Sequence, residues 1–518
     1  MDNRSADHDR AVFLCQANRE LSRQNFLERV SRAADGFAKM GLRAGDTVAI
    51  LMRNDIAFLE ASLAAKAAGG VAVPINWHST APEITYILDD CRAQVIVGHS
   101  DLLASAGHAA LPVERVLAVR SPSDVVAAYG LDPARAEIRP WMIEWDRWLM
   151  EHDVGDASFA LRSDSMLYTS GTTGRPKGVR RHVPTRDQQQ LIEETRKSIY
   201  GVKPGARILV PGPLYHGAPN GIAIHAAQVA DSVILMERFD PEQLLHLIEK
   251  YRIDTIFMVP TMFNRLLKLE QSVRQNYDLS SLKFVLHAAA PCPVDLKRRM
   301  IEWWGPIIHE FYGGTESGPC AFCSSEQWLR YPGTVGKVVD NATLRVMDAH
   351  GNECATGEPG EIYMRLHHYP DFTYNGLDDK RREIERDGLI TLGDIGYMNA
   401  EGYLFLCDRK RDMVIIGGAN VYPAEIESVL LGMPGVRDCA VFGVPDEDYG
   451  ERLLALVEPH DDTSLAVSDI QGFLKGRLNG FKLPRRIEIR RNLPREDSGK
   501  ILKRVLRAPY WDGTGRQV

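Results

Sequence analysis

Long hydrophobic runs are missing from this chain of 518 residues, which contains no stretch of about 18 consecutive apolar residues. We therefore expect no membrane-spanning helix. The first 30 residues are polar and of mixed charge, without the apolar segment of a signal peptide. A cytoplasmic location is expected from this pattern.

Basic residues are not in excess either. Lysine and arginine number 62 against 69 aspartate and glutamate residues, which gives a formal net charge of −7. Because proteins that bind nucleic acids usually carry a basic patch or stripe, this balance argues against a nucleic-acid partner. We expect a monomer or homodimer that acts on small molecules.

Cysteines are few for this length, and the eight present are scattered along the chain. This usage is typical of a reduced cytosolic enzyme and unlike a disulfide scaffold. Cys320 and Cys323 form a lone CxxC pair, but a zinc site needs a second pair of ligands at suitable spacing. None occurs nearby, so we expect both thiols to be buried as small apolar groups.

Length and patterning predict several domains of the α/β class. A chain of this length is too long to fold around a single hydrophobic core, so two to four domains are expected. Apolar residues recur at helical spacing in 24–40 and 55–68, and buried strands are indicated at 46–52 and 71–75. This alternation favours parallel strands between helices. Residues 121–163 show no regular pattern and are expected to be irregular.

The most informative stretch is the loop YTSGTTGRPKG at 168–178, which we expect at the exit of a strand. Its hydroxyl side chains offer donors, its glycines let the backbone approach a ligand closely, and Lys177 adds a mobile positive charge. This chemistry suits a polyphosphate. The loop differs from a Walker A motif, which has glycine directly before the lysine and Ser or Thr after it.

Further candidate segments follow along the chain. GPLYHGAPNG at 212–221 indicates a loop in which His216 could wall a pocket, and HAAAPCP at 287–293 leaves room for something flat above its alanines. In EFYGGTES at 310–317, an aromatic residue, a hydroxyl and a carboxylate could meet a base, a phosphate and Mg²⁺. Asp394 is a candidate for ribose hydroxyls.

The last hundred residues read as a separate unit. The charged run DRKRD at 408–412 precedes a buried β segment and a Gly-Gly turn, as expected of a linker that enters a new domain. PREDSGKI at 494–501 places Lys500 behind a Ser-Gly turn that is expected to be mobile.

Together these motifs resemble the adenylate-forming superfamily of acyl-CoA synthetases, adenylation domains of peptide synthetases and luciferases, in the same order and over residues 20 to 507. The resemblance implies a large N-terminal domain of layered α/β sheets plus a β-barrel at 1–408. A small mobile C-terminal α+β lid domain would follow at 409–518. It also implies ATP, Mg²⁺ and coenzyme A as cofactor and co-substrates, with an acyl-adenylate intermediate.

The resemblance also implies roles for individual residues. The nucleotide contacts would be Thr169, Ser170, Gly171, Thr172, Thr173, Lys177, Ala289, Ala290, Pro291, Glu310, Tyr312, Gly313, Thr315, Asp394 and Arg409. The catalytic set would be Lys500, Thr315, Glu316 and His216, with Glu316 also holding the metal. The acyl pocket would be formed by His216, Gly217, Ala218, Gly221, Val259, Ala288 and Gly314. The hinge would be Arg411, where the family usually has Lys or Asp, and the coenzyme A tunnel would be lined by Gly417, Gly418 and Ala419.

Several functions remain open at this point. A CoA ligase is favoured, and its branch looks like the bacterial bile-acid-CoA ligases and the long-chain fatty-acid ligases, which implies a bulky hydrophobic acid. The alternative is a stand-alone adenylation enzyme that passes the acyl group to a carrier protein or another acceptor. An amino-acid adenylation domain should carry a pocket aspartate, and residues 211–222 contain none. A luciferase-like oxygenase is rare, and a non-catalytic relative is disfavoured because Glu316, Asp394 and Lys500 are all present.

Overall fold

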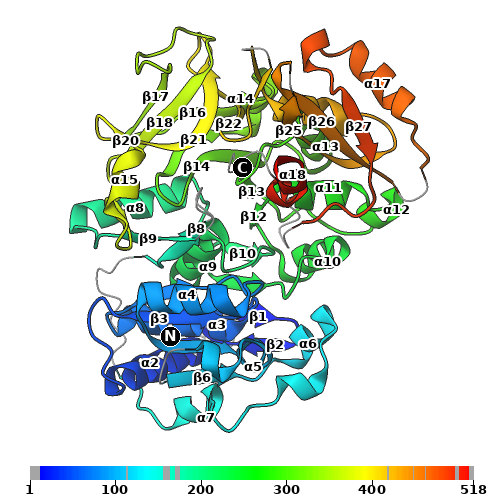
Figure 1. The fold of residues 1–518 in the computed structure, drawn as a ribbon. Helices are drawn as coiled ribbons and strands as arrows, with labels where there is room; N and C mark the ends of the chain where they lie inside the picture. Colours follow the sequence, from blue (N-terminus) through cyan, green and yellow to red (C-terminus); the bar gives the residue numbers. More distant parts are fainter. Residues whose placement is uncertain are drawn as a thin grey trace, which may run out of the picture.

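The computed structural model describes most of the chain, namely residues 12–111, 115–155, 164–169, 176–416, 419–446, 448–460, 463–495 and 501–512. Figure 1 shows the elements in sequence colours, from the blue N-terminal layer through green and yellow sheets to the orange and red C-terminal part.

The N-terminal layer is a parallel sheet of order β4-β3-β5-β6-β7. Its strands are β3 (Thr47–Leu51), β4 (Val71–Pro74), β5 (Ala93–His99), β6 (Arg115–Val119) and β7 (Ile143–Glu144). Its helices are α2 (Arg23–Lys39), α3 (Ile56–Ala67), α4 (Ala81–Cys91), α5 (Ser100–Ala106), α6 (Ser123–Tyr129) and α7 (Trp145–Met150), with short 3₁₀ turns η1 (His108–Ala110) and η2 (Pro133–Ala136). The strand–helix alternation predicted from the sequence is confirmed here.

The second layer is a long sheet whose central strands are also parallel. These strands are β1 (Leu14–Gln16), β10 (Arg207–Val210), β11 (Ser232–Leu235), β12 (Thr255–Met258), β13 (Phe284–His287) and β14 (Ile308–Gly314), with β2 (Arg19–Leu21) antiparallel at the edge. The associated helices are α8 (Arg186–Ser198), α9 (Gly217–Val229), α10 (Pro241–Tyr251), α11 (Pro260–Leu267), α12 (Gln271–Arg274) and α13 (Val294–Trp304).

The same sheet continues into antiparallel strands that curl into the barrel-like part. They are β15 (Gly318–Cys323), β16 (Thr334–Val338), β17 (Ala342–Met347), β18 (Gly360–Leu366), β20 (Glu385–Arg386), β21 (Leu389–Met398) and β22 (Leu404–Arg409), with α14 (Ser325–Arg330) and α15 (Asp378–Glu383). A small sheet of order β19-β9-β8 joins β8 (Leu167–Thr169), β9 (Lys177–Arg181) and β19 (Phe372–Tyr374).

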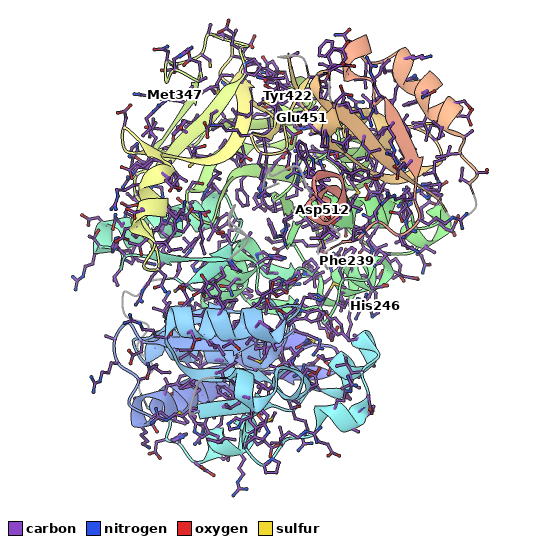
Figure 2. The ribbon with its side chains drawn as sticks, in the orientation of Figure 1. Phe239, His246, Met347, Tyr422, Glu451 and Asp512 are labelled. Atoms are coloured by element: carbon purple, nitrogen blue, oxygen red, sulfur yellow. The ribbon has the colours of Figure 1, made fainter. Side chains whose placement is uncertain are left out.

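The C-terminal part has its own sheet of order β24-β23-β26-β25, with β27 beside β26. Its elements are β23 (Val414–Ile416), β24 (Ala419–Val421), α16 (Pro423–Leu431), β25 (Val436–Asp446), β26 (Gly450–Pro459), α17 (Val467–Lys475), η3 (Gly480–Lys482), β27 (Arg486–Ile489) and α18 (Lys503–Trp511). Apolar side chains are buried on both faces of this sheet, and Figure 2 shows the side chains over the whole frame.

Two expectations about local structure are wrong. Residues 121–163 contain α6, β7 and α7 within the described residues, and Trp145 and Trp148 of α7 are buried against Phe37. The segment 212–221 is no continuous loop either, because helix α9 begins at Gly217. Its glycines and proline lower helix propensity, but the helix is buried on several sides and packing outweighs propensity.

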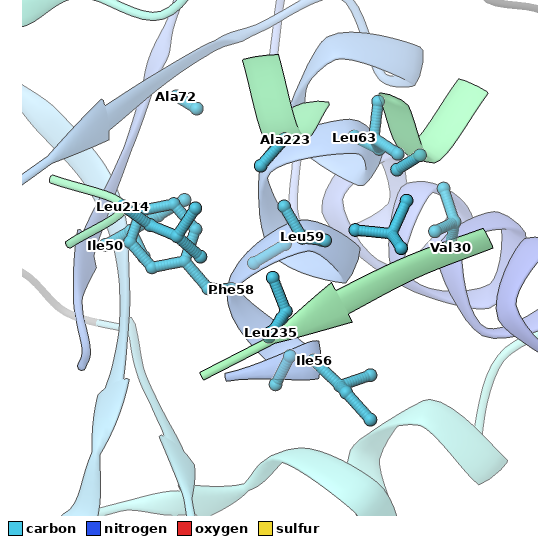
Figure 3. Close-up of a cluster of buried hydrophobic side chains, with 14 of the residues drawn as sticks. Val30, Ile50, Ile56, Phe58, Leu59, Leu63, Ala72, Leu214, Ala223 and Leu235 are labelled. Atoms are coloured by element: carbon cyan, nitrogen blue, oxygen red, sulfur yellow. The ribbon is translucent and has the colours of Figure 1, made fainter. Parts of the chain in front are cut away.

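The two parallel layers share one hydrophobic core (Figure 3). Ile50 of β3, Leu59 of α3, Ala223 of α9 and Leu235 of β11 are all almost fully buried in it. Because α3 belongs to the first layer and α9 to the second, this core fixes α9 against the first sheet.

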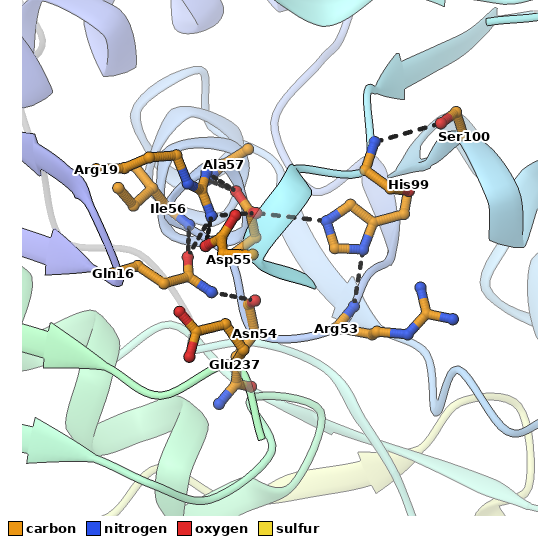
Figure 4. A network of polar contacts seen from close by, with 12 residues as sticks. Gln16, Arg19, Arg53, Asn54, Asp55, Ile56, Ala57, His99, Ser100 and Glu237 are labelled. Carbon is orange, nitrogen blue, oxygen red and sulfur yellow. Dashed lines mark hydrogen bonds and ion pairs between the residues drawn. The ribbon is translucent and has the colours of Figure 1, made fainter. Parts of the chain in front are cut away.

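A buried polar network completes the junction (Figure 4). Asp55 caps α3 by accepting from the Ala57 backbone N–H, and its carboxylate also meets Arg19 at 2.9 Å and His99 Nε2 at 3.5 Å. Burial alone would raise the pKa of the Asp55 carboxyl. The hydrogen bond from His99 and the charge of Arg19 outweigh burial and hold that pKa well below its usual range.

Asn54, the residue before Asp55, binds the loop that leads into α9. Its side-chain amide donates to the carbonyl oxygens of Gly212 and Met236, both at 2.9 Å, and accepts from the Leu214 N–H at 2.8 Å. Three backbone groups of the second layer are thus satisfied by one side chain of the first layer.

Replacing Asn54 should therefore destabilise the protein strongly. Asn54→Ala leaves three buried backbone groups without this partner, and we expect a loss of about 3–5 kcal/mol in unfolding free energy. Thermal and denaturant unfolding measure it. The control is Asn276→Ala, because the Asn276 side chain is exposed. Equal unfolding midpoints for the two variants would contradict the role given to Asn54.

Candidate active site

A cavity of about 1300 Å³ lies at the carboxyl ends of the parallel strands of the second layer. Its lining residues follow β10 (Gly212 and Pro213), β12 (Val259), β13 (Ala288–Ala290) and the end of β14 (Gly313–Glu316). In open α/β sheets this edge is where ligands bind. Eight lysine and arginine side chains line the cavity against six acidic ones, so the cavity is more basic than the molecule as a whole.

The hydroxyl-rich loop joins two strands at the cavity wall. Strands β8 and β9 form an antiparallel hairpin in which Thr169 lies opposite Lys177, and both residues line the cavity. The predicted strand before the loop is confirmed. The predicted contacts Ser170, Gly171, Thr172 and Thr173 lie outside the described residues.

Lys177 is a buried cation at the cavity wall. It is 9% exposed, and its Nζ lies 5.0 Å from the centre of the Tyr374 ring. Within the described chain no carboxylate forms an ion pair with it. Burial, reinforced by the charge of Lys380, lowers the pKa of the Lys177 ammonium. A buried cation without an anionic protein partner is suited to an anionic ligand.

Thr315 and Glu316 lie on a braced turn after β14. Arg181 donates to the carbonyl oxygens of both residues, at 2.7 and 2.8 Å. The Glu316 carboxylate accepts from the Tyr374 hydroxyl at 3.0 Å and from Thr169 Oγ1 at 3.4 Å. Both residues line the cavity, so the turn presents a hydroxyl and an oriented carboxylate at fixed positions.

Glu316 fits a hard divalent cation. No lysine or arginine in the described segments forms an ion pair with its carboxylate, and carboxylate oxygen is the ligand type that Mg²⁺ prefers. The described residues contain no cluster of three or more histidine, cysteine or acidic side chains arranged to hold a metal. A metal here would therefore take one protein carboxylate and oxygens from a ligand.

Asp394 and Arg409 lie opposite each other on β21 and β22. Arg409 Nε lies 3.4 Å from Asp394 Oδ1, and the Tyr312 hydroxyl donates to Asp394 Oδ2 at 2.8 Å. Asp394 and Arg409 line the cavity. Tyr312 is 7% exposed and belongs to the core behind them, so it orients the carboxylate from behind.

The alanine segment after β13 also lines the cavity, through Ala288, Ala289 and Ala290 but without Pro291. Ala289 adopts a left-handed backbone conformation with φ of 73°. A non-glycine residue in this region is strained, and such strain is commonly found at ligand sites.

Glu310 does not line the cavity, although the resemblance implied a nucleotide contact for it. Its carboxylate meets Lys297 Nζ at 2.6 Å and His287 Nε2 at 3.4 Å, and all three side chains are buried. Burial raises the pKa of the Glu310 carboxyl, partly offset by Lys297. Burial also lowers the pKa of His287, and the charge of Lys297 adds to this effect. The structure thus assigns Glu310 to a buried ion pair behind β14.

Helix α9 forms one long wall of the cavity. His216 is its N-cap residue and Gly217, Ala218 and Gly221 face the cavity. A Cβ on Gly217 would lie 3.2 Å from Thr315 Oγ1, so the first turn of α9 abuts the Thr315 turn. A Cβ on Gly221 would meet nothing within 4 Å, so Gly221 faces open space. Val259 and Gly314 line the same cavity.

The C-terminal part reaches the cavity through Arg411, Arg495 and Leu502. Arg411 accepts a hydrogen bond at its carbonyl from Arg507 at 3.3 Å. Ala419 pairs with Ile416 and is exposed rather than part of the cavity wall. Gly417, Gly418 and Lys500 lie outside the described residues, but Arg495 and Leu502 are described on either side of Lys500.

The CxxC pair singled out in the sequence lies on β15. Cys320 and Cys323 are free thiols buried on opposite faces of β15, in different cores, as expected for small apolar groups. Burial raises the pKa of each thiol to about 12.

No helix in the described segments is long and apolar enough to cross a membrane.

Several cavity residues were missed at the sequence level. Arg181 and Tyr374 brace Glu316 from β9 and β19, and a charged group formed by Lys66, Asp164, Arg196 and His225 also lines the cavity. These residues come from separate segments without a shared motif, so only the fold brings them together. The one local signal was Arg181, which follows the lysine of the hydroxyl-rich loop on the same strand.

Comparison with known proteins gives consistent matches over nearly the whole chain. The sequence profile of the AMP-binding enzyme family matches residues 2–369, and that of the AMP-binding enzyme C-terminal domain matches residues 425–500. A feruloyl-CoA synthase of Amycolatopsis is 33% identical, covering 95% of this chain and 93% of the relative.

Two further matches are a ligase named for a carrier protein and a solved structure with a bound intermediate. A fatty acid–[acyl-carrier-protein] ligase of Streptomyces coeruleorubidus is 32% identical over 98% of this chain and 95% of the relative. The solved o-succinylbenzoate CoA synthetase of Bacillus subtilis, in complex with its acyl-adenylate intermediate, has a TM-score of 0.79 at 25% identity. It covers 96% of this chain and 95% of its own.

The Lys297–Glu310 pair should be essential for stability. Lys297→Met leaves a buried carboxylate without its cation, and we expect a loss of about 3–5 kcal/mol in unfolding free energy. Thermal unfolding measures it, with Lys283→Met as the exposed control. The double variant Lys297→Met/Glu310→Met should recover much of the loss, because it removes the stranded charge. A double variant as unstable as Lys297→Met would contradict this explanation.

Proposed function

The chain belongs to the AMP-binding enzyme family, and we propose that it is an AMP-forming acid–CoA ligase acting on a bulky, largely hydrophobic carboxylic acid. It uses ATP with Mg²⁺ and passes the acyl group to coenzyme A. One observation carries the proposal. Lys177, Thr315, Glu316 and Asp394 come from three separate segments and line a single cavity.

The nucleotide would lie across the strand ends. Lys177 and the hydroxyl-rich loop bind the β- and γ-phosphates, and Thr315 donates to the α-phosphate. Asp394 accepts from the ribose hydroxyls, with its carboxylate oriented by the Tyr312 hydroxyl and by Arg409. The small side chains of Ala288–Ala290 leave a flat surface for adenine.

Glu316 would hold Mg²⁺ together with phosphate oxygens, and the bound ion would neutralise charge on the phosphate chain. Tyr374 and Thr169 keep the Glu316 carboxylate aimed into the cavity before any metal arrives. This pre-orientation lowers the entropy cost of binding the ion.

Two transfers follow from this arrangement. In the first, a carboxylate oxygen of the acid attacks the α-phosphorus of ATP, a P–O bond forms, and pyrophosphate leaves as the α–β bond breaks. In the second, the thiol of coenzyme A loses its proton and attacks the acyl carbon, and AMP leaves as the C–O bond breaks. Both steps develop negative charge on oxygens, so positioned donors and cations supply most of the catalysis.

The C-terminal part, residues 409–518, would act as a lid that hinges at Arg411. Lys500 would reach the attacking carboxylate and the α-phosphate in the first step only. This is supported by Arg495 and Leu502, the described residues beside it, which line the cavity. After rotation of the lid, Gly417, Gly418 and Ala419 would line the path of the pantetheine arm, with His216 at the junction with the acyl pocket.

The acid would occupy the space along α9. Gly221 leaves that space open, and Phe257, Val259 and Ile224 provide apolar walls. A feruloyl-CoA synthase among the relatives supports an acid of comparable bulk.

The acyl acceptor has one alternative, because a related ligase is named for an acyl carrier protein. Activity with free coenzyme A and with a phosphopantetheinyl carrier protein would separate the two.

The two half-reactions should separate by mutation. We expect Lys500→Ala to lower acid-dependent pyrophosphate release from ATP by about 10²–10³-fold, because it removes one stabiliser of developing charge. Transfer from supplied acyl-adenylate to coenzyme A should remain within severalfold of wild type, and Gly418→Trp should show the reverse pattern. If both variants lose both half-reactions equally, the two-conformation proposal fails. If the wild type releases no pyrophosphate with any acid, the function itself is wrong.

Acid length should depend on Gly221. Gly221→Leu places a branched side chain in the open space along α9 and should shift the ratio of kcat/KM for long over short acids down by about tenfold or more. The control is Gly472→Leu, since Gly472 also lies in a helix with open space around it. An unchanged ratio in Gly221→Leu would mean that the acid does not lie along α9.

A further inference from the structure

The cavity extends well beyond the nucleotide residues, along the whole length of α9. Gly217, Gly221, Ile224, His225 and Gln228 all line it, and they follow one another on a single face of the helix. At a rise of 1.5 Å per residue, His225 lies about 12 Å along the axis from Gly217. Gly217 abuts Thr315, so about 12 Å separates the end of the cavity near Thr315 from its far end near His225.

The far end is charged, unlike the middle. Lys66 in the last turn of α3, Arg196 of α8, His225 of α9 and Asp164 all line the cavity there. The side chains of Lys66, Arg196 and His225 are only 16%, 10% and 6% exposed. An acid that is apolar along its whole length would displace water from this charged end, which is costly for any group there that has no hydrogen-bond partner in the protein.

Most of these groups already have protein partners. Arg196 donates to both carboxylate oxygens of Asp164, at 2.9 and 3.1 Å, and to Glu193 at 3.1 Å. His225 Nε2 lies 3.1 Å from Glu193 Oε2. Burial lowers the pKa of His225 to about 3, and the positive charge of Arg196 contributes, so this imidazole is neutral near pH 7.

Lys66 is the exception. Its Nζ lies 3.9 Å from the nearer Asp164 oxygen, beyond hydrogen-bond distance, and Arg196 already occupies both oxygens of that carboxylate. In the described parts of the chain Lys66 Nζ donates no hydrogen bond. Burial also lowers the pKa of the Lys66 ammonium, while Asp164 partly offsets this. A half-buried ammonium that faces a cavity with unused donors is suited to an acceptor oxygen of a ligand.

We infer that the acid bound here carries an oxygen acceptor at its far end, about 12 Å from the reacting carboxylate, and that Lys66 donates to it. The acceptor is a hydroxyl, a carbonyl or a second carboxylate, and the middle of the acid is apolar. The inference rests on the proposed ligase function and narrows its substrate class. It makes Lys66 a specificity residue that contacts substrate rather than the reacting atoms.

The test compares three acids of one length with the full-length wild-type enzyme, namely decanoate, ω-hydroxydecanoate and decanedioate. We expect kcat/KM for at least one oxygen-bearing acid to exceed that for decanoate by about tenfold, the effect of one hydrogen bond to a charged group. Preference for both indicates a general acceptor site, and preference for decanedioate alone indicates recognition of a charge.

Variants of Lys66 connect the preference to the side chain. Lys66→Met should reduce the preference to near unity, mainly through a higher KM for the oxygen-bearing acid, and Lys66→Arg should retain part of it. Lys250→Met is the matched control, because Lys250 also lies in the last turn of a helix but is exposed.

Two results would overturn the inference. One is a wild-type enzyme that prefers decanoate to both oxygen-bearing acids. This result does not depend on whether any variant folds. The other is a folded Lys66→Met enzyme that keeps the wild-type preference. Either result leaves the proposed function intact, provided that decanoate drives pyrophosphate release. Absence of release with every acid is the separate failure of the function itself.

Discussion

The side-chain amide of Asn54 connects the two parallel layers at the point on which the cavity depends. It binds Gly212, Leu214 and Met236 of the second layer from a position directly before α3 of the first. The loop held in this way leads into α9, and the first turn of α9 abuts Thr315. A shift between the layers would therefore move the α9 wall of the cavity relative to the Thr315 turn, and the hydrophobic core around α3 and α9 opposes such a shift.

The candidate site combines rigid supports with cations that donate no hydrogen bond to a carboxylate of the described residues. The supports are hydrogen bonds from neighbouring side chains. Arg181 donates to the Thr315 carbonyl, and Tyr374 donates to the Glu316 carboxylate. Tyr312 donates to the Asp394 carboxylate. Lys177 and Lys66 make no hydrogen-bonded ion pair within the described residues. The first group fixes geometry, whereas the second is left to meet a ligand. This division explains how an acidic protein can present a cavity that attracts anions.

Much of the fold and part of the site follow from the sequence. Strands and helices of the parallel layers were predictable because their apolar periodicity is regular, and motifs at strand ends were predictable as neighbours because such ends meet at one edge of a sheet. Helix α9 was missed because Gly217, Pro219 and Gly221 have low helix propensity. The packing of its buried side chains stabilises the helix instead. Glu310 lies on β14 next to site residues but points to the opposite side, which the motif alone did not reveal. Lys66 and Arg196 are far apart in the sequence, so their proximity required the tertiary structure.

The C-terminal sheet buries apolar side chains on both faces, and its two cores contain only residues from 414 onward within the described chain. Helices α16 and α17 cover one face and α18 covers the other. This unit therefore needs no surface of the remaining protein to complete its hydrophobic interior. Reorienting it would open neither of these two apolar clusters, so such a motion should carry only a small change in heat capacity.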